Sequence, residues 1–266
     1  MNVLDDLCAT AKRTRTRIAL SEGDDPRVAK AAAQAAREGI ADIQLIGPTA
    51  EIQALLDGEE GAGKIEVLDP ASSPWLERYS LEYFELRKHK GMTLEQARAA
   101  MRGQLGFAAM MVRLGDSDGT IGGAVATTKD TVRTALQVIG KAAGANVVSS
   151  CFLMSLAPPF DQAVIFADCG LILQPTSAEL ASIAIASAES LSVFTGQTPR
   201  VAMLSFSTMG SVRADAHESI NRIRSSIKLI RQQAPDLNVD GEMQFDAALM
   251  PDIGGTKAPD SQVAGH

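Results

Sequence analysis

The sequence predicts an α/β protein built on parallel sheets, and three observations carry this prediction. Short apolar runs alternate along the chain with stretches whose apolar residues recur at helical spacing. Aromatic residues make up only 4% of the chain although hydrophobic residues make up 45%, so we expect helices of small side chains packed closely on a sheet. The length of 266 residues is enough for one large or two ordinary α/β domains.

The first half of the chain shows the alternation most clearly. The expected elements are a helix over 2–13, a strand over 17–20, a helix over 28–37, a strand over 42–46, a helix ending near 56 and a strand over 64–68. Asp25 and Pro26 are a typical N-cap and first helical residue. Residues 74–114 then have a helical pattern without an intervening strand, and Thr93 with Gln96 fits a capping box. Strict alternation of this kind predicts a parallel sheet covered on both faces.

The second half resumes the alternation after a break near Gly144. The expected elements are strands over 147–154, 163–168 and 200–206 and helices over 177–194 and 212–232. We therefore expect two α/β domains, the first over 1–144 and the second over 145–266.

A turn between a predicted strand and a predicted helix is the first candidate binding site. Gly122 and Gly123 end an apolar run and let the backbone approach a ligand closely. The first N–H groups of the following helix lack internal partners and favour an anion. The side chains that could contribute are Thr127, Thr128, Thr131 and Arg133. The alternative is that the glycines only turn the chain and that a threonine only caps the helix.

A second turn, over residues 204–211, repeats these features after the strand expected at 200–206. Its polar candidates are Ser205, Ser207, Thr208, Gly210 and Ser211. We expect this turn to meet the N-terminus of the helix that follows. In parallel sheets such turns lie at the carboxyl ends of strands, where ligands collect.

The densest positive charge in the sequence is the run Arg87, Lys88, His89 and Lys90. It could attract an anionic substrate. The alternative is a solvated helix end, because cations favour the last turn of a helix.

Overall charge and cysteine content narrow the class of protein. The net charge of -7 and the pI near 5.1 argue against nucleic acid and acidic membranes as partners. Cys8, Cys151 and Cys169 are widely spaced in apolar surroundings, which predicts reduced core residues and a cytosolic compartment. Neither the cysteines nor the three histidines have metal-ligand spacing. No apolar run approaches the length of a membrane span, and the first residues do not form a signal peptide.

Several segments together resemble the phosphate acetyltransferase family. They are ELRKHKGMT at 85–93, GGAVATTKDTVR at 122–133, LSFSTMGS at 204–211 and DGEMQFDAAL at 240–249. The resemblance implies two three-layer α/β/α domains with a cleft, a fold shared with isocitrate and isopropylmalate dehydrogenases. It implies interconversion of acetyl-CoA plus phosphate with acetyl phosphate plus CoA. It also implies a cytoplasmic homodimer that needs no cofactor, CoA being a substrate.

The resemblance also assigns roles to single residues. Arg87 and Arg133 match family arginines that bind CoA, and we expect Arg133 to contribute more because it lies beside a helix N-terminus. Segments lining the family's cleft match Thr127, Thr128, Thr131, Ser207, Thr208, Gly210 and Ser211. The acidic and amide residues of the 240–249 segment match a family signature and are interpreted as structural, because carboxylates would repel a phosphate.

The chain departs from the family pattern at its end. In the family the chain continues beyond the segment matching 261–265 with another strand and helices, which carry a Ser-Arg pair and an Asp that acts as base on the CoA thiol. Because nothing here corresponds to them, no catalytic base is assigned, and we expect a C-terminally shortened chain with weak CoA binding and little turnover. The alternatives are a non-catalytic acetyl-CoA-sensing module and a butyryl specificity.

Overall fold

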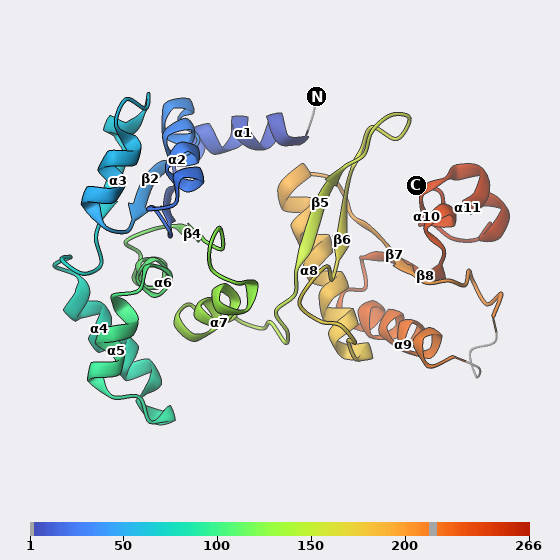
Figure 1. The fold of residues 1–266 in the computed structure, drawn as a ribbon. Helices are drawn as coiled ribbons and strands as arrows, with labels where there is room; N and C mark the ends of the chain where they lie inside the picture. The colour runs from blue at the N-terminus through green and yellow to red at the C-terminus, as the bar shows by residue number, and fades with distance from the viewer. Residues whose placement is uncertain (1–2, 213–216) are drawn as a thin grey trace. The chain divides into compact units, whose positions relative to one another are not determined.

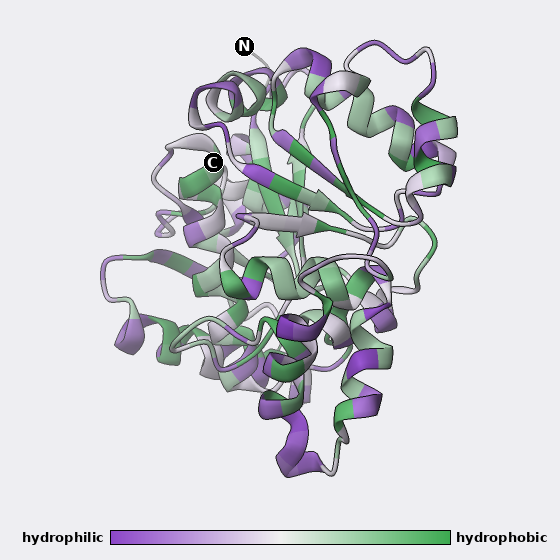
Figure 2. Ribbon diagram, turned by 90° about the vertical axis from the view of Figure 1, so that its left-hand side faces the viewer, coloured by the Kyte–Doolittle hydropathy of each residue, from purple (hydrophilic) through white to green (hydrophobic). Residues whose placement is uncertain are grey.

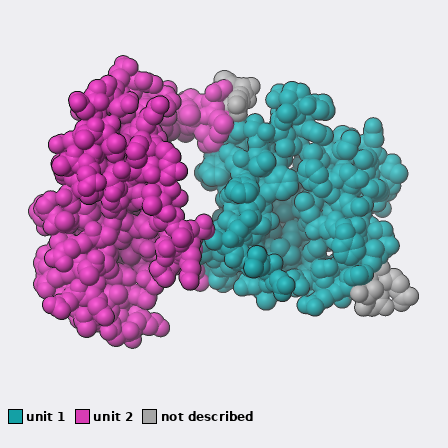
Figure 3. Space-filling view, in the orientation of Figure 1, with its two compact units in different colours: residues 1–3, 142–266 teal, residues 4–141 magenta. Residues whose placement is uncertain are grey.

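The computed structural model describes residues 3–212 and 217–266, and they fall into two compact units. Unit 2 spans residues 4–141 and unit 1 spans residues 142–266 (Figure 3).

Unit 2 is built on a four-stranded sheet in which all strands are parallel. The strands are β1 (Arg17–Leu20), β2 (Asp42–Ile46), β3 (Glu66–Leu68) and β4 (Gly119–Ile121), in the spatial order β3-β2-β1-β4 (Figure 1). The carboxyl ends of parallel strands meet at one edge. The turns that follow β1 and β4 therefore lie beside each other at this edge.

Helices surround this sheet in the order that the sequence predicts. They are α1 (Val3–Thr14), α2 (Pro26–Glu38), α3 (Thr49–Leu56), α4 (Leu76–Arg87), α5 (Leu94–Met101), α6 (Gln104–Leu114) and α7 (Thr128–Val138), with short 3-10 turns at Ala62–Lys64 and Lys88–Lys90. The predicted caps are confirmed, since the Asp25 side chain accepts the Arg27 N–H and Thr93 with Gln96 forms a capping box. The third strand begins two residues late because the 3-10 turn extends to Lys64.

The core of unit 2 depends on small residues, as the composition predicts. Four alanines on one face of α2 are 0–4% exposed: Ala29, Ala32, Ala33 and Ala36. They pack with Leu45 and Ile52. Figure 2 shows hydrophobic residues, coloured green, along much of the length of the strands. A helix whose inner face is alanine can approach the sheet closely, which leaves little room for larger side chains.

Ala32→Leu should lower the free energy of unfolding by about 1–3 kcal/mol, because added methylenes in a close-packed core force neighbouring atoms apart. The matched control is Ala31→Leu, one position earlier on the exposed face of α2, which should change it by less than about 0.5 kcal/mol. Urea denaturation followed by circular dichroism measures both. Equal stability of the two variants would contradict close packing at this helix.

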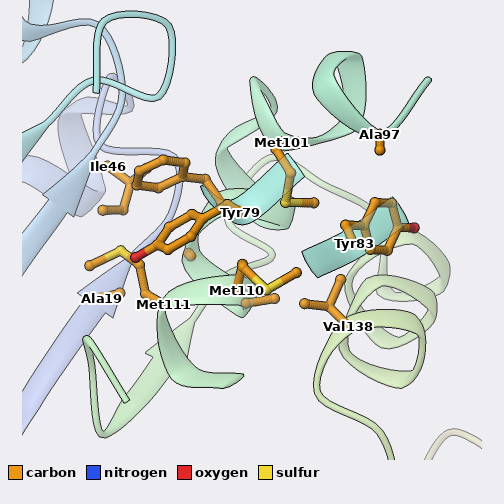
Figure 4. Packing of buried hydrophobic residues seen from close by; sticks show 12 residues of the cluster. Ala19, Ile46, Tyr79, Tyr83, Ala97, Met101, Met110, Met111 and Val138 are labelled. Atoms are coloured by element: carbon orange, nitrogen blue, oxygen red, sulfur yellow. The ribbon is translucent and has the colours of Figure 1, made fainter. Parts of the chain in front are cut away.

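The aromatic residues of unit 2 lie in a second hydrophobic cluster (Figure 4). Tyr79 is fully buried, and its ring centroid lies 4.8 Å from that of Phe107. Its hydroxyl donates a 2.8 Å hydrogen bond to Asp116. Burial, together with this bond to Asp116, raises the pKa of Tyr79. The cluster joins α4, α5 and α6 to residues of β1 and β2.

The described residues of unit 1 form two separate pairs of strands. Strands β5 (Cys151–Ser155) and β6 (Ala163–Ala167) are antiparallel, whereas β7 (Arg200–Leu204) and β8 (Asn238–Met243) are parallel. The helices are α8 (Ser177–Thr195), α9 (Glu218–Gln233), α10 (Phe245–Leu249) and α11 (Pro251–Lys257). The α/β class is confirmed. The antiparallel pair follows from the short turn between β5 and β6, because a parallel pair needs a crossover of a dozen residues or more.

Two expectations about unit 1 need correction. The helix predicted over 212–232 begins at Glu218, with residues 213–216 outside the described part of the chain.

The second correction concerns the expectation that no apolar run approaches the length of a membrane span. Among the helices described, α8 is long and apolar enough to cross a membrane by length and composition, with 22% of the stretch buried. Alanine and isoleucine raise its hydropathy. One such helix is weak evidence for a span, and α8 packs against α9 and β6.

The cysteines are free but do not lie in the core, contrary to the prediction. Cys8 and Cys151 are exposed and Cys169 is partly buried. Cys8 lies on α1, a helix with no buried residue, and Cys151 begins the largely exposed β5. The apolar neighbours of both cysteines in the sequence are themselves on surface elements, which explains the wrong prediction.

Candidate functional site

The turn after β4 is shaped by two glycines that lie against β1. A Cβ on Gly122 would stand 2.4 Å from the Ser21 Oγ and 2.8 Å from the Leu105 Cδ2. Gly123 has φ +105°, a conformation that side chains disfavour. The Ser21 N–H donates to the Ile121 carbonyl at 3.1 Å and joins the ends of the two strands. Both glycines are therefore required by the local geometry.

The backbone amides of this turn bind an anion, and the anion is a side chain of the protein. Glu22, which follows β1 and is 6% exposed, points its carboxylate into the turn. Its Oε2 accepts N–H groups of Gly123 and Ala124, both at 2.8 Å, and its Oε1 accepts those of Val125 at 3.1 Å and Ala126 at 2.6 Å. The sequence predicts that the backbone of this turn can approach a ligand anion. In the structure, the Glu22 carboxylate occupies the four amides of residues 123–126 instead.

The surroundings of Glu22 favour its charged form. Burial raises the pKa of the carboxyl, but the four backbone N–H groups together lower it more, so the net pKa lies below the usual value. The backbone of Glu22 is in the left-handed region, with φ 65°. A residue other than glycine adopts this conformation only when its surroundings enforce it. The four hydrogen bonds supply that enforcement.

The first turn of α7 follows directly and uses some of its predicted ligand groups internally. Thr127 is the N-cap, since its Oγ1 accepts the Asp130 N–H at 3.1 Å. The Thr131 Oγ1 donates to the Thr127 carbonyl at 3.1 Å. In the described part of the chain, the exposed Thr128 side chain has no hydrogen-bond partner. The N-cap interpretation of Thr127 is confirmed, and Thr128 keeps its hydroxyl for a ligand.

Arg133 lies one turn further along α7 with its side chain 55% exposed. Its Nη2 lies 2.5 Å from the Asp130 Oδ1. An exposed ion pair of this kind contributes less than about 1 kcal/mol. The guanidinium can therefore exchange Asp130 for a phosphate at little cost.

Arg87 ends α4 and differs from the basic residues that follow it. Its side chain is partly buried, and its Nε is buried without a hydrogen-bond partner among the described residues. Lys88, His89 and Lys90 are exposed, and Lys88 pairs with Glu85. The solvated-helix-end interpretation fits these three residues. It does not fit Arg87, whose guanidinium retains unused donors.

The second predicted turn, in unit 1, also surrounds a buried carboxylate. Glu242 is 1% exposed. Its Oε1 accepts the Ser207 Oγ–H at 3.1 Å and the Gly210 N–H at 2.9 Å, and Arg224 donates to both oxygens at 2.8 and 3.1 Å. Burial raises the pKa of Glu242, but Arg224 and the N–H and O–H donors outweigh it and hold the pKa at about 2. The structural interpretation of Glu242 fits this network.

Further hydrogen bonds join side chains of this turn to one another and to Gln244. The Thr208 N–H donates to the Ser211 Oγ at 3.2 Å, and that Oγ lies 3.0 Å from the Ser207 Oγ. The Gln244 N–H donates to the Thr208 Oγ1 at 3.0 Å. Because α9 begins at Glu218, the turn does not run directly into a helix N-terminus as predicted. Glu242 replaces the helix as the group that holds the turn.

A cavity of about 610 Å³ lies beside Glu22 within unit 2. Its walls are largely apolar and include Met101, Leu105, Val125 and Val138. Asp24 and Asp25 also line it. A second cavity of about 410 Å³ in unit 1, between α8, β6 and β7, is lined by none of the predicted site residues. Within the described ranges, no group of three His, Cys, Asp or Glu side chains is placed to hold a metal ion.

The sequence reasoning missed Glu22, which organises the first turn. A signal was present, because Glu22 directly follows a predicted strand and so lies at the edge where ligands collect. Its partners are more than 100 residues away in the sequence, so local patterns do not identify them.

Comparison with known proteins completes the description of the site. The profile of the family described as phosphate acetyl/butaryl transferase matches residues 2–266. The phosphate acetyltransferase of Paracoccus denitrificans is 49% identical over 271 residues, which cover 100% of this chain and 80% of that protein. That of Thermoanaerobacterium thermosaccharolyticum is 40% identical, with 100% and 81% covered. The solved structure of EutD phosphotransacetylase from Staphylococcus aureus aligns with a TM-score of 0.88 at 34% identity, covering 99% of this chain and 79% of the other.

Proposed function

This chain belongs to the phosphate acetyl/butaryl transferase family, and on that premise we propose that it interconverts acetyl-CoA plus phosphate with acetyl phosphate plus CoA. The observation that carries this proposal is the match over residues 2–266 together with relatives named phosphate acetyltransferase at 40–49% identity. Those names favour an acetyl group over a butyryl group as the unit transferred.

The phosphates of CoA are assigned to Arg133 and Arg87. Arg133 is exposed beside the N-terminus of α7 and is paired only with Asp130 among the described residues. Arg87 has a buried Nε without a partner in the described ranges. Guanidinium groups bind phosphates through paired N–H donors. The hydroxyl of Thr128 and the first N–H groups of α7 add neutral donors.

The backbone amides of residues 123–126 are excluded from this role, because Glu22 occupies all four. A phosphate there would have to displace a carboxylate and would meet its charge at short range. The largely apolar cavity beside the turn suits the uncharged pantetheine arm of CoA, with the acidic Asp24 and Asp25 keeping phosphates away from it.

In the reaction, the CoA sulfur attacks the carbonyl carbon of acetyl phosphate. A bond forms between the sulfur and the carbonyl carbon, and the bond between that carbon and the oxygen bridging to phosphorus breaks. Phosphate leaves with this oxygen, and the thiol proton passes to a base. The contribution assigned to this chain is positioning of CoA and neutralisation of phosphate charge, both of which lower the barrier of acyl transfer.

A cytoplasmic homodimer is part of the proposal. The antiparallel hairpin β5–β6 supports it, since Phe152 is 60% and Met154 40% exposed. Exposed apolar side chains gathered on one hairpin are typical of a surface that pairs with another subunit.

The alternative of an acetyl-CoA-sensing module makes a different prediction in one assay. The assay measures CoA acetylation from acetyl phosphate beside calorimetric titration with CoA, and turnover, even at a low rate, together with binding would support the enzyme. Binding of CoA without turnover would favour the sensing module. Turnover that is faster with butyryl phosphate would favour the other acyl specificity.

Asp130→Asn should tighten CoA binding about two- to fivefold, because it removes the negative charge that competes for Arg133. The Asn side chain keeps an oxygen that can accept the hydrogen bond from the Thr127 Oγ1. Glu95→Gln, in the first turn of α5, is the control for removal of a charge and should leave the affinity unchanged. Calorimetry measures both, and weaker CoA binding by Asp130→Asn would place Asp130 itself among the ligand's contacts.

A further inference from the structure

We propose that Glu22 is a positioning residue for the substrate site: its carboxylate holds residues 123–126 so that the first two turns of α7 present Thr128 and Arg133 to CoA. The inference rests on the proposed function for the identity of the ligand. Its geometric part rests on the contacts of Glu22 alone.

The contacts of Glu22 reach four consecutive amides of the turn between β4 and Thr127, those of residues 123–126. Two N–H groups bind each carboxylate oxygen, at distances from 2.6 to 3.1 Å. Hydrogen bonds to a charged group contribute about twice as much as neutral ones. The turn has few other anchors, because Gly122, Gly123, Ala124 and Val125 are exposed. The path of the backbone into α7 therefore depends mainly on this side chain.

A second contact ties the same turn to α2. The Arg27 Nη2 donates to the Ala124 carbonyl at 2.8 Å, and its guanidinium also pairs with Asp25, the N-cap of α2. The turn is thus held by its N–H groups through Glu22 and by one carbonyl through Arg27. Because Arg27 is 72% exposed, solvent weakens this second contact. The buried Glu22 is the stronger anchor of the two.

Electrostatics and positioning make opposite predictions for this residue. A carboxylate near an anionic ligand repels it, so neutralising Glu22 by charge alone would tighten CoA binding. Loss of the anchor would instead move α7's first turn away from its bound position and weaken CoA binding. The sign of the change therefore separates the two roles.

Glu22→Gln tests this sign with little change in size. The Gln amide offers one oxygen and one NH2 group. Whichever way it is oriented, two of the four backbone N–H groups face another donor and lose their partner. Glu22→Asp keeps the negative charge on a shorter side chain and should keep some of the hydrogen bonds from the N–H groups of residues 123–126. Glu51→Gln is the control for removal of a charge at the same sheet edge, since Glu51 is exposed in the first turn of α3, which follows β2.

The experiment measures KM for CoA, kcat and amide hydrogen exchange in the wild-type chain and the three variants. For Glu22→Gln we expect KM to rise about tenfold, kcat to change less than about threefold, and exchange at residues 123–126 to accelerate. Glu22→Asp should fall between Glu22→Gln and the wild type. Glu51→Gln should leave KM unchanged or slightly lower. A merely structural defect would reduce the amount of folded enzyme, which lowers kcat and leaves KM unchanged.

Two outcomes would overturn the proposal. An unchanged or lower KM for CoA in Glu22→Gln would show that Glu22 does not position the site. Unchanged exchange at residues 123–126 would show that the carboxylate does not hold the turn, whatever the activity. Absence of turnover in the wild-type chain is a distinct result that counts against the proposed function, and the exchange measurement still decides the role of Glu22 in the turn.

Discussion

Replacing Arg224 with alanine should lower the free energy of unfolding by about 3 kcal/mol, because it leaves the buried carboxylate of Glu242 without its cation. Removal of one partner from a buried ion pair costs roughly 3–5 kcal/mol. We expect the lower end of that range because the Arg224 side chain is 35% exposed, whereas that of Glu242 is 1% exposed. The turn over residues 207–211 should loosen first, since Ser207 and Gly210 share the same carboxylate.

Arg231→Ala is the matched control, because Arg231 lies on the same helix but pairs with Asp240 at 3.5 Å and is 59% exposed. Its removal should cost less than about 1 kcal/mol. Urea unfolding at pH 7 measures both variants. Equal losses in the two variants would contradict a special role for the buried pair.

The same network predicts a pH dependence with a definite sign. The pKa of Glu242 is about 2 in the folded protein against a usual 4.5, so the unfolded chain binds the proton more readily. The stabilisation is therefore complete above pH 4.5 and is lost as the pH falls toward 2. In Arg224→Ala the folded pKa should rise, so unfolding titrations should show less dependence on pH in this window.

The second large effect concerns affinity for CoA. Arg133→Ala should weaken CoA binding by about 1.5–3 kcal/mol, the range of a hydrogen bond to a charged group. Arg87→Ala should have a smaller effect, because Arg87 lies at a helix C-terminus rather than beside an N-terminus that already favours anions. The double variant should lose at least as much affinity as Arg133→Ala.

Arg13→Ala is the control for the loss of one positive charge, since Arg13 lies in the last turn of α1, away from the predicted ligand groups. Calorimetric titration of CoA at two salt concentrations measures all four variants. The deficit of Arg133→Ala should shrink at high salt as the ions screen the phosphate. Unchanged affinity in both single variants would remove the arginines from the site.

Much of unit 2 could be predicted from the sequence because its signals are local. The N-cap Asp25, the capping box at Thr93 and the N-cap Thr127 each act within a few residues of their own helix. The apolar runs of β1 and β2 match the observed strands to the residue.

Predictions that depended on distant contacts were less successful. The glycine turn has the sequence of an anion site, but its anion is a glutamate 101 residues earlier than the first amide it binds. The hydroxyl-rich turn at 204–211 likewise closes on Glu242 rather than on a helix. Arg224 lies on α9, and the local sequence of this helix shows no sign of a buried partner. Such pairings are set by the tertiary fold, which a local pattern does not contain.

The predicted site residues therefore differ in the polar groups that they leave for a ligand. Arg87, Arg133 and Thr128 retain polar groups that a ligand could use. The hydroxyl groups of Thr127 and Thr131 instead form hydrogen bonds at the start of α7. Ser207, Thr208, Gly210 and Ser211 lie together near the Glu242 carboxylate, and their role toward a ligand stays a prediction. The central claim that follows is that guanidinium groups, and not the amides of the glycine turn, bind the phosphates of CoA.

A crystal structure of the protein with CoA tests this claim most directly. We expect phosphate oxygens within hydrogen-bond distance of the Arg133 guanidinium, with Asp130 released from it. Glu22 should still accept the N–H groups of residues 123–126. A CoA phosphate bound to those four amides, with the Glu22 carboxylate displaced from the turn, would contradict the account.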